Sequence, residues 1–146
     1  MMKKIIVLGL CLISISMHAQ EGEVKATIQT FFEGFHAKDT IKMKNYCHEK
    51  MLLQSINEST KGTKLIEEKA TDFFKSMTQI PSTMKFEERI LNFEVKIDGS
   101  MAHVWTPYEF YINETYSHGG VNAFTLILEN NQWKIVHLID TRRKKK

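Results

Sequence analysis

Residues 101–143 read MAHVWTPYEFYINETYSHGGVNAFTLILENNQWKIVHLIDTRR. Apolar and polar residues alternate along three segments of this stretch, 101–112, 118–128 and 133–143. A period of two is typical of β-strands that bury one face. His, Asn, Asp, Glu and Tyr side chains occur among those that would point inward. A sheet of this kind usually encloses a pocket, so we expect a ligand-binding cavity rather than a wholly aliphatic core.

The segments that precede residue 84 predict helices and one short strand. Apolar residues recur at spacings of three and four over 21–37, which predicts an amphipathic helix: Val24, Ile28, Phe31, Phe32 and Phe35. Asp39 is predicted to cap a second helix that ends near Tyr46. Residues 47–54 predict a short strand, and Asn57 to Gly62 a polar loop. A third helix is expected over about 64–78, with Leu65, Ile66, Ala70, Phe73, Phe74 and Met77 facing inward.

From about Met84 the period changes to two, and Leu91, Phe93, Val95 and Ile97 alternate with polar residues. Asp98-Gly99 signals a tight turn into the next strand, residues 113–117 a second turn, and Asn130-Asn131 a third. Helices followed by an antiparallel meander predict an α+β fold. We expect a cone-like bent antiparallel sheet of four long strands, plus a possible short one, wrapped round about three N-terminal helices.

Residues 1–19 have the features of a secretory signal peptide. A basic start, Lys3-Lys4, precedes an apolar run over residues 5–15, and Ala19 offers a cleavage position. That run is too short for a bilayer, which needs about 20 apolar residues. A lipoprotein modified at Cys11 is the alternative. We expect a periplasmic or secreted protein without stable membrane insertion, with a single domain over 20–141 and a basic tail over 142–146.

Composition limits the partners of the exported chain. Residues 1–19 contain two of the 20 Lys and Arg and none of the 17 Asp and Glu, so 18 basic and 17 acidic residues remain, a net charge of +1. This balance argues against nucleic acid as a partner. Cys47 is then the only cysteine, which rules out an intramolecular disulfide and favours a buried thiol over a reactive one.

Two residues of the strands are candidates for acid–base chemistry, which needs a titratable group oriented by a second polar group. His118 opens a strand beside Gly119-Gly120, where a ligand or another strand can approach closely. Asp140 follows apolar residues in alternation, so its carboxylate would lie on an apolar face and need a partner. Arg142 shares that face. A histidine satisfied by the backbone and a structural Asp–Arg pair are the competing interpretations.

Further residues are candidates for contact with a ligand. Asn122 and Phe124 share the parity of His118 and should line the cavity with it. On the strand 101–112 the face that carries Tyr108 is the more apolar and should be the core. Trp105 lies on the other face and enters the cavity only if Pro107 marks a bulge that reverses the parity. No zinc-binding pair, phosphate loop or dinucleotide motif is present, so we expect neither a metal nor a cofactor.

The chain resembles the nuclear transport factor 2-like superfamily, in its SnoaL-like branch. The resemblance covers the phenylalanine-rich helix that ends at Asp39, the Asp98-Gly99 turn, segments 105–111 and 117–124, and the closing 133–143. It implies a bent sheet that opens at one end into a pocket, and a homodimer formed through the outer sheet face. The superfamily includes isomerases, dehydratases, cyclases and non-catalytic binding proteins, so the fold does not define the function.

Three hypotheses for the function follow. The first is an exported pocket protein that binds a small apolar or aromatic ligand. The second is a cofactor-free isomerase, dehydratase or cyclase that uses His118 with Asp140. In ketosteroid isomerase a carboxylate base works opposite a tyrosine, and Asp140 with Tyr108 would be the corresponding pair. The third is a dimeric interaction module.

Overall fold

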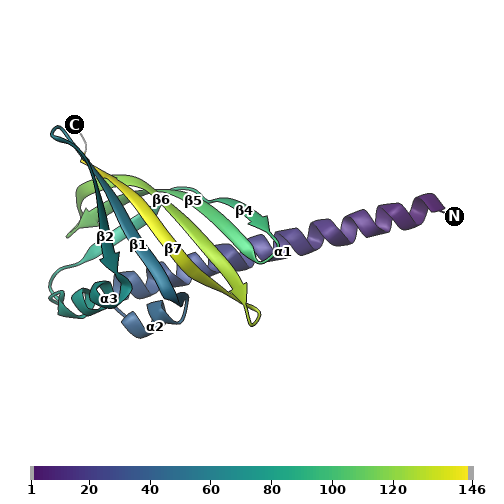
Figure 1. The fold of residues 1–146 in the computed structure, drawn as a ribbon, viewed down its shortest axis with the longest axis horizontal. Helices are drawn as coiled ribbons and strands as arrows, with labels where there is room; N and C mark the ends of the chain where they lie inside the picture. Colours follow the sequence, from purple (N-terminus) through teal and green to yellow (C-terminus); the bar gives the residue numbers. More distant parts are fainter. Residues whose placement is uncertain (1, 145–146) are drawn as a thin grey trace.

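The computed structural model describes residues 2–144, with side chains described from His18 onward. It is an α+β fold, as predicted, in which one curved and unclosed sheet wraps round the long first helix (Figure 1). The helices are α1 (Met2–Ala37), α2 (Thr40–Lys44) and α3 (Ala70–Gln79). The strands are β1 (Cys47–Ser59), β2 (Gly62–Lys69), β3 (Phe86–Ile90), β4 (Glu94–Asp98), β5 (Met101–Ile112), β6 (Thr115–Glu129) and β7 (Gln132–Arg143).

The sheet is mixed rather than purely antiparallel. Its strands lie in the order β2-β1-β7-β6-β5-β3, and β4 also pairs with β5. The antiparallel meander from β4 to β7 is confirmed, whereas β1 pairs in parallel with β7. Positive φ angles at Gly99, Asn113, Asn130 and Asn131 form the tight turns of the meander, since glycine and asparagine adopt such angles at low cost.

The hairpin β1–β2 corrects the prediction for residues 47–78. Strand β1 continues to Ser59, residues 62–69 form β2, and the third helix begins only at Ala70. Every residue of β2 is exposed, including Leu65 at 57%. An edge strand that buries neither face has no alternating pattern to reveal it, and the adjacent Leu65 and Ile66 imitate one side of a helix.

The predicted strand over 84–97 is divided in two. Ile90 pairs with Tyr108 and Glu94 with Trp105, so three residues, 91–93, lie opposite two residues of β5. This is a β-bulge, in which the extra residue reverses the side-chain alternation across it. Pro107 of β5 lies within the bulge and accepts a hydrogen bond from the Leu91 N–H at 2.9 Å, but has no N–H to donate.

Strand β5 itself keeps its alternation through Pro107. Ala102, Val104, Thr106 and Tyr108 are all buried, at 3% exposure or less. Trp105, on the other face, is 45% exposed. The bulge therefore lies in the partner segment and leaves the faces of β5 as the apolar pattern predicts them.

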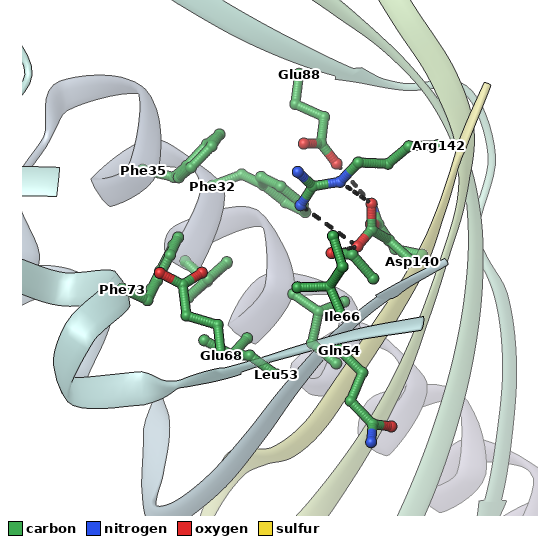
Figure 2. A pocket seen from close by; sticks show the side chains of 14 residues that line it. Phe32, Phe35, Leu53, Gln54, Ile66, Glu68, Phe73, Glu88, Asp140 and Arg142 are labelled. Atoms are coloured by element: carbon green, nitrogen blue, oxygen red, sulfur yellow. Dashed lines mark hydrogen bonds and ion pairs between the residues drawn. The ribbon is translucent and has the colours of Figure 1, made fainter. Parts of the chain in front are cut away.

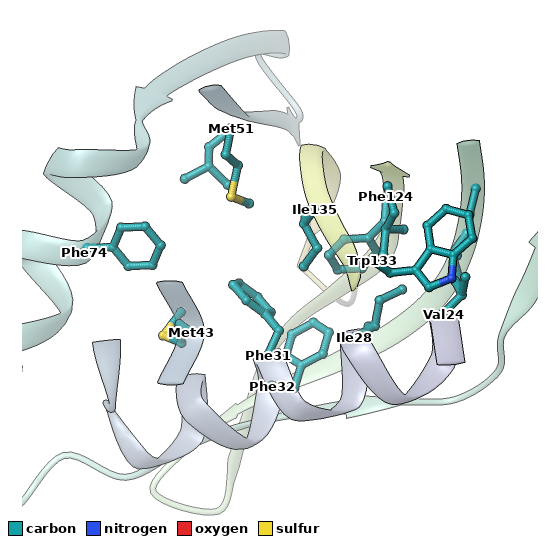
Figure 3. Close-up of a cluster of buried hydrophobic side chains, with 14 of the residues drawn as sticks. Val24, Ile28, Phe31, Phe32, Met43, Met51, Phe74, Phe124, Trp133 and Ile135 are labelled. Carbon is teal, nitrogen blue, oxygen red and sulfur yellow. The ribbon is translucent and has the colours of Figure 1, made fainter. Parts of the chain in front are cut away.

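Helix α1 packs its apolar stripe into the concave face of the sheet. Val24, Ile28, Phe31 and Phe32 are buried as predicted, against residues of β5, β6 and β7 such as Phe124 (Figure 3). The helix runs back to Met2, beyond the predicted start at residue 21. Within the described residues, no helix is long and apolar enough to cross a membrane.

Helix α2 begins as predicted. The Asp39 side chain accepts hydrogen bonds from the N–H groups of Ile41 and Lys42, at 3.1 and 2.9 Å. These bonds satisfy donors that the first turn of a helix leaves free. The helix ends at Lys44, two residues before the predicted end. The predicted basic tail lies within the described residues only as far as Lys144.

We expect Gly120→Ala to destabilise the fold. A Cβ at this position would lie 1.8 Å from the backbone oxygen of Thr141, so β6 and β7 would have to separate. Overpacking of this kind costs about 1–3 kcal/mol or more. Urea denaturation measures the free energy of unfolding, and Gly22→Ala is the control, since nothing lies within 4 Å of its Cβ. A Gly120→Ala variant as stable as Gly22→Ala would contradict the close approach of these strands.

Candidate functional site

A cavity of about 160 Å³ lies between the concave sheet face and the helices (Figure 2). Its apolar wall comes mainly from α1, α3 and the β1–β2 hairpin: Phe31, Phe32, Phe35, Phe73, Leu53 and Ile66, with Leu138 from β7. Its polar lining consists of Gln54, Ser55, Glu68, Glu88, Asn122, Asp140 and Arg142. In Figure 2 the aromatic rings lie on the helical side and Glu88, Asp140 and Arg142 on the sheet side. The cavity is thus aromatic on one side and charged on the other.

Asp140 is the most heavily bonded group of the cavity. Its carboxylate accepts hydrogen bonds from Ser55 Oγ at 2.5 Å, Tyr108 OH at 3.1 Å and Arg142 Nε at 2.7 Å. The residue is only 7% exposed. A carboxylate is buried at such a position only when donors and a counter-charge compensate for lost water. Asp140 is therefore a positioning group that fixes the guanidinium of Arg142 at the cavity.

Gly120 permits the bond between Tyr108 and Asp140. Tyr108 lies opposite Gly120 in the register, and Gly120 separates β5 from β7 at this level. Because Gly120 has no side chain, the Tyr108 ring can extend across it, and its hydroxyl also donates to the Thr141 carbonyl at 2.9 Å. Burial and the nearby Asp140 and Glu88 carboxylates raise the pKa of Tyr108. The phenol therefore stays protonated and acts as a hydrogen-bond donor.

Glu88 is the second carboxyl group of the cavity and has a different environment. Asn122 Nδ2 donates to its Oε1 at 2.6 Å, and Glu88 forms no ion pair among the side chains that the structure describes, those of residues 18–144. Burial, and secondarily the negative charge of Asp140, raise its pKa from 4.5 to about 7, although the Asn122 hydrogen bond and Arg142 act in the opposite direction. Glu88 can therefore gain or lose a proton near neutral pH.

Helix α1 holds the backbone of Glu88 in place. The Glu88 N–H donates to Nε2 of His36 at 2.9 Å, so this ring nitrogen is unprotonated. Burial lowers the pKa of His36, which agrees with a neutral ring. The His36 ring also stacks on Phe32 of the cavity wall, with ring centroids 6.1 Å apart. The aromatic wall and the titratable carboxyl are thus connected through one histidine.

The residues predicted from sequence, apart from His118, separate into three groups. Asn122, Asp140 and Arg142 line the cavity, and Tyr108 supports them through its hydroxyl. Phe124 is fully buried and packs against Phe31 and Phe32 as part of the core. Trp105 lies on the outer face of β5 and is not brought to the cavity.

His118 lies on the inner face of β6 but outside the cavity lining. Its ring is 4.9 Å from that of Phe110 and 6.0 Å from that of Tyr108, measured between centroids, and its Nδ1 lies 3.1 Å from Ser117 Oγ. Burial and the charge of Arg142 lower its pKa, more than Asp140 raises it. The bonds of Asp140 go to Ser55, Tyr108 and Arg142 instead of to His118.

Sequence reasoning missed Glu88 and Glu68. If the alternation seen at Val95 and Ile97 is extended backwards, Glu88 falls on the outer face. The bulge at 91–93 reverses that assignment. Glu68 was placed in a helix, whereas it lies in β2 opposite Leu53 and faces the cavity with it. The one available signal was Pro107, which marked the bulge but not the strand that contains it.

Comparison with known structures identifies the class of fold. The fold is similar to that of a nuclear transport factor 2-like protein of unknown function from Shewanella baltica, with 12% identity, a TM-score of 0.63, and 87% of this chain and 96% of the other covered. It is also similar to a putative scytalone dehydratase from Novosphingobium aromaticivorans, with 9% identity, a TM-score of 0.70, and coverage of 90% and 89%.

A third similar structure is a putative dehydratase of the same class from Streptomyces avermitilis, with 9% identity, a TM-score of 0.67, and coverage of 88% and 99%. The chain thus has the nuclear transport factor 2-like fold, as the sequence resemblance predicted. More narrowly, residues 19–138 match the family described as "Putative lumazine-binding", and the chain belongs to that family. No curated protein matches the sequence.

We expect Glu88 to make stability depend on pH between about 4.5 and about 7. The folded protein holds the Glu88 proton more tightly than the unfolded chain does, so Glu88 lowers the free energy of unfolding as pH rises through this window. Glu88→Gln cannot titrate. The free energy of unfolding of the variant minus that of the unmodified protein should therefore rise with pH across the window and stay constant above it. Urea denaturation at a series of pH values measures this difference, and a difference independent of pH would contradict the shifted pKa.

Proposed function

We propose that the protein binds a small aromatic or heteroaromatic molecule in the cavity beside Glu88 and Arg142. The observation that carries this proposal is the two-sided lining: phenylalanine rings on one side, and hydrogen-bonding groups on the other. Phe32, Phe35 and Phe73 offer ring faces and edges that favour contact with a second aromatic system. Asn122, Glu88 and Arg142 offer the few fixed polar groups that orient a ligand.

The size of the cavity supports a ligand of one or two rings. Apolar cavities of about 150 Å³ in other proteins accommodate benzene, and this cavity has about 160 Å³. The description of the family, "Putative lumazine-binding", is consistent with a heteroaromatic ligand and makes lumazine the natural first probe. A two-ring compound would fill the cavity and extend its polar edge towards the sheet.

We expect Ile66→Trp to abolish binding of lumazine without unfolding the protein. Ile66 lines the cavity and is 39% exposed, so a larger side chain can be accommodated at the surface while it obstructs the cavity. Leu65→Trp is the matched control, because Leu65 lies on the opposite face of β2 and is 57% exposed. Quenching of lumazine fluorescence measures binding. Equal affinity of the two variants would place the ligand elsewhere, and no binding by the unmodified protein would argue against lumazine itself.

Proton transfer is a second candidate function, favoured by the pKa of Glu88 at about 7. A general base is most effective when its pKa lies near the working pH. In this role Glu88, rather than His118, would remove a proton next to the carbonyl group of a bound β-hydroxy ketone. The bond between the β-carbon and its hydroxyl would then break, and the hydroxyl would take the proton from Glu88 and leave as water. Ring-sized β-hydroxy ketones should then yield enones, whose ultraviolet absorbance follows the reaction. The rate should rise with pH through about 7 and vanish in Glu88→Gln. A rate equal to that without protein would exclude this role.

We also propose that residues 1–19 direct export and are then removed, and that the exported protein forms a homodimer. The basic start and short apolar run support export. Exposed Met101, Trp105 and Ile127 on the outer sheet face support self-association. The intact mass of protein from the periplasmic fraction of a bacterial host would test cleavage after Ala19. Sedimentation of that protein at micromolar concentration would test the dimer, and a monomer would exclude it.

A further inference from the structure

We propose that the cavity selects a positively charged ring, a small aromatic amine or amidine in its protonated form, over neutral or anionic rings of the same shape. This inference rests on the proposed function and specifies its ligand class. The cavity contains three carboxyl groups, those of Glu68, Glu88 and Asp140, and one cationic group, that of Arg142.

The cation of the cavity is already neutralised within the chain. Arg142 donates to Asp140 through Nε at 2.7 Å and through Nη2 at 3.5 Å. An anionic ligand would have to share this guanidinium with a carboxylate that Ser55 and Tyr108 hold in place. It would also meet Glu88 on the same side of the cavity and Glu68 of β2, and the repulsion between like charges is strong where water is partly excluded.

Glu88, in contrast to Arg142, lacks a partner of opposite charge among the side chains that the structure describes. Its described partner is the neutral amide of Asn122, so the carboxylate is enclosed without a counter-charge of its own. A buried charge is costly unless it is paired. A ligand cation held beside Oε2 would supply the missing charge, and Glu68 from β2 would face the same cation from the other side.

The aromatic wall favours the same ligand. Phe32, Phe35 and Phe73 line the cavity on the side opposite Glu88 and Asp140. The face of an aromatic ring carries negative charge density and attracts cations, and this attraction is largest where water is excluded. A planar cation is therefore attracted by both sides of the cavity, whereas a planar anion is repelled by both.

The protonation of Glu88 should make this selectivity depend on pH. The pKa of Glu88 is about 7, so its carboxyl group loses its proton near neutral pH. Because a cation binds the ionised form better, the affinity of the protein for a cationic ligand should rise with pH through about 7. The titratable and charged groups around Glu88 are His36 of α1, Tyr108 of β5, and Asp140 and Arg142 of β7. Glu68 of β2 lines the same cavity, and His118 of β6 lies beyond Phe110, the residue opposite Glu88. Of these, His36 and His118 have pKa values that burial lowers, which favours their neutral forms.

Three isosteric probes test the proposal on the full chain: benzamidine, which stays cationic over the pH range used, neutral benzamide, and anionic benzoate. Calorimetric titration at about pH 8 should show benzamidine binding about tenfold more tightly than benzamide, as expected for a hydrogen bond to a charged group, with benzoate weakest. At about pH 6 the advantage of benzamidine over benzamide should shrink several-fold.

Two variants test whether the preference for a cation depends on Glu88. Glu88→Gln keeps an acceptor for Asn122 and should reduce the ratio of benzamidine affinity to benzamide affinity about tenfold. Glu87→Gln is the matched control, because Glu87 is exposed on the outer face of β3 and pairs with Arg89. If Glu88→Gln fails to fold, the ranking of the three probes on the unmodified protein still decides the question.

Each contrary result has a distinct meaning. Tightest binding by benzoate would overturn the proposal and identify Arg142 as an anion receptor. Equal binding of all three probes would overturn the preference for a cation but leave the ring-binding function intact. Binding of lumazine without binding of any of the three probes would have the same meaning. Failure of lumazine and of all three probes would contradict the ring-binding function as well.

Discussion

The packing of α1 into the concave face of a bent sheet is the constraint on which the other features depend. Phe31 and Phe32 belong both to the hydrophobic core and to the wall of the cavity. One stripe of the helix therefore closes the core against Phe124 and leaves a hollow beyond it, because a straight helix cannot follow a curved sheet along its whole length. The β1–β2 hairpin and α3 cover that hollow with Ile66 and Phe73.

The polar side of the hollow depends on two local irregularities of the backbone. The bulge at 91–93 turns Glu88 towards α1 instead of towards solvent. Gly120 lets β6 and β7 approach so closely that Tyr108 reaches Asp140 across the strand between them. Regular strands with the same composition would present other side chains to the cavity. Bulges and close approaches of this kind often occur next to binding sites because they redirect single side chains.

Two carboxyl groups in one cavity have different roles because their neighbours differ. Asp140 has a guanidinium and two hydroxyl donors, so its charge is compensated within the chain. Glu88 has one amide donor, and burial raises its pKa to about 7. This contrast separates a carboxylate that is held by donors of the chain itself from a carboxyl group, that of Glu88, which can respond to a ligand or to pH.

The sequence alone was sufficient to predict each feature that depends only on residues close together in the chain. The stripe of α1, the Asp39 cap, the turns at Gly99 and Asn130, and the inward parity of Asn122, Asp140 and Tyr108 all follow from local periodicity and backbone preference. Strand β2 and the inward position of Glu88 were decided only by the tertiary structure. An edge strand exposed on both faces has no burial pattern. A bulge is defined by its register against a partner strand that is distant in sequence, and side-chain alternation within one segment contains no information about that register.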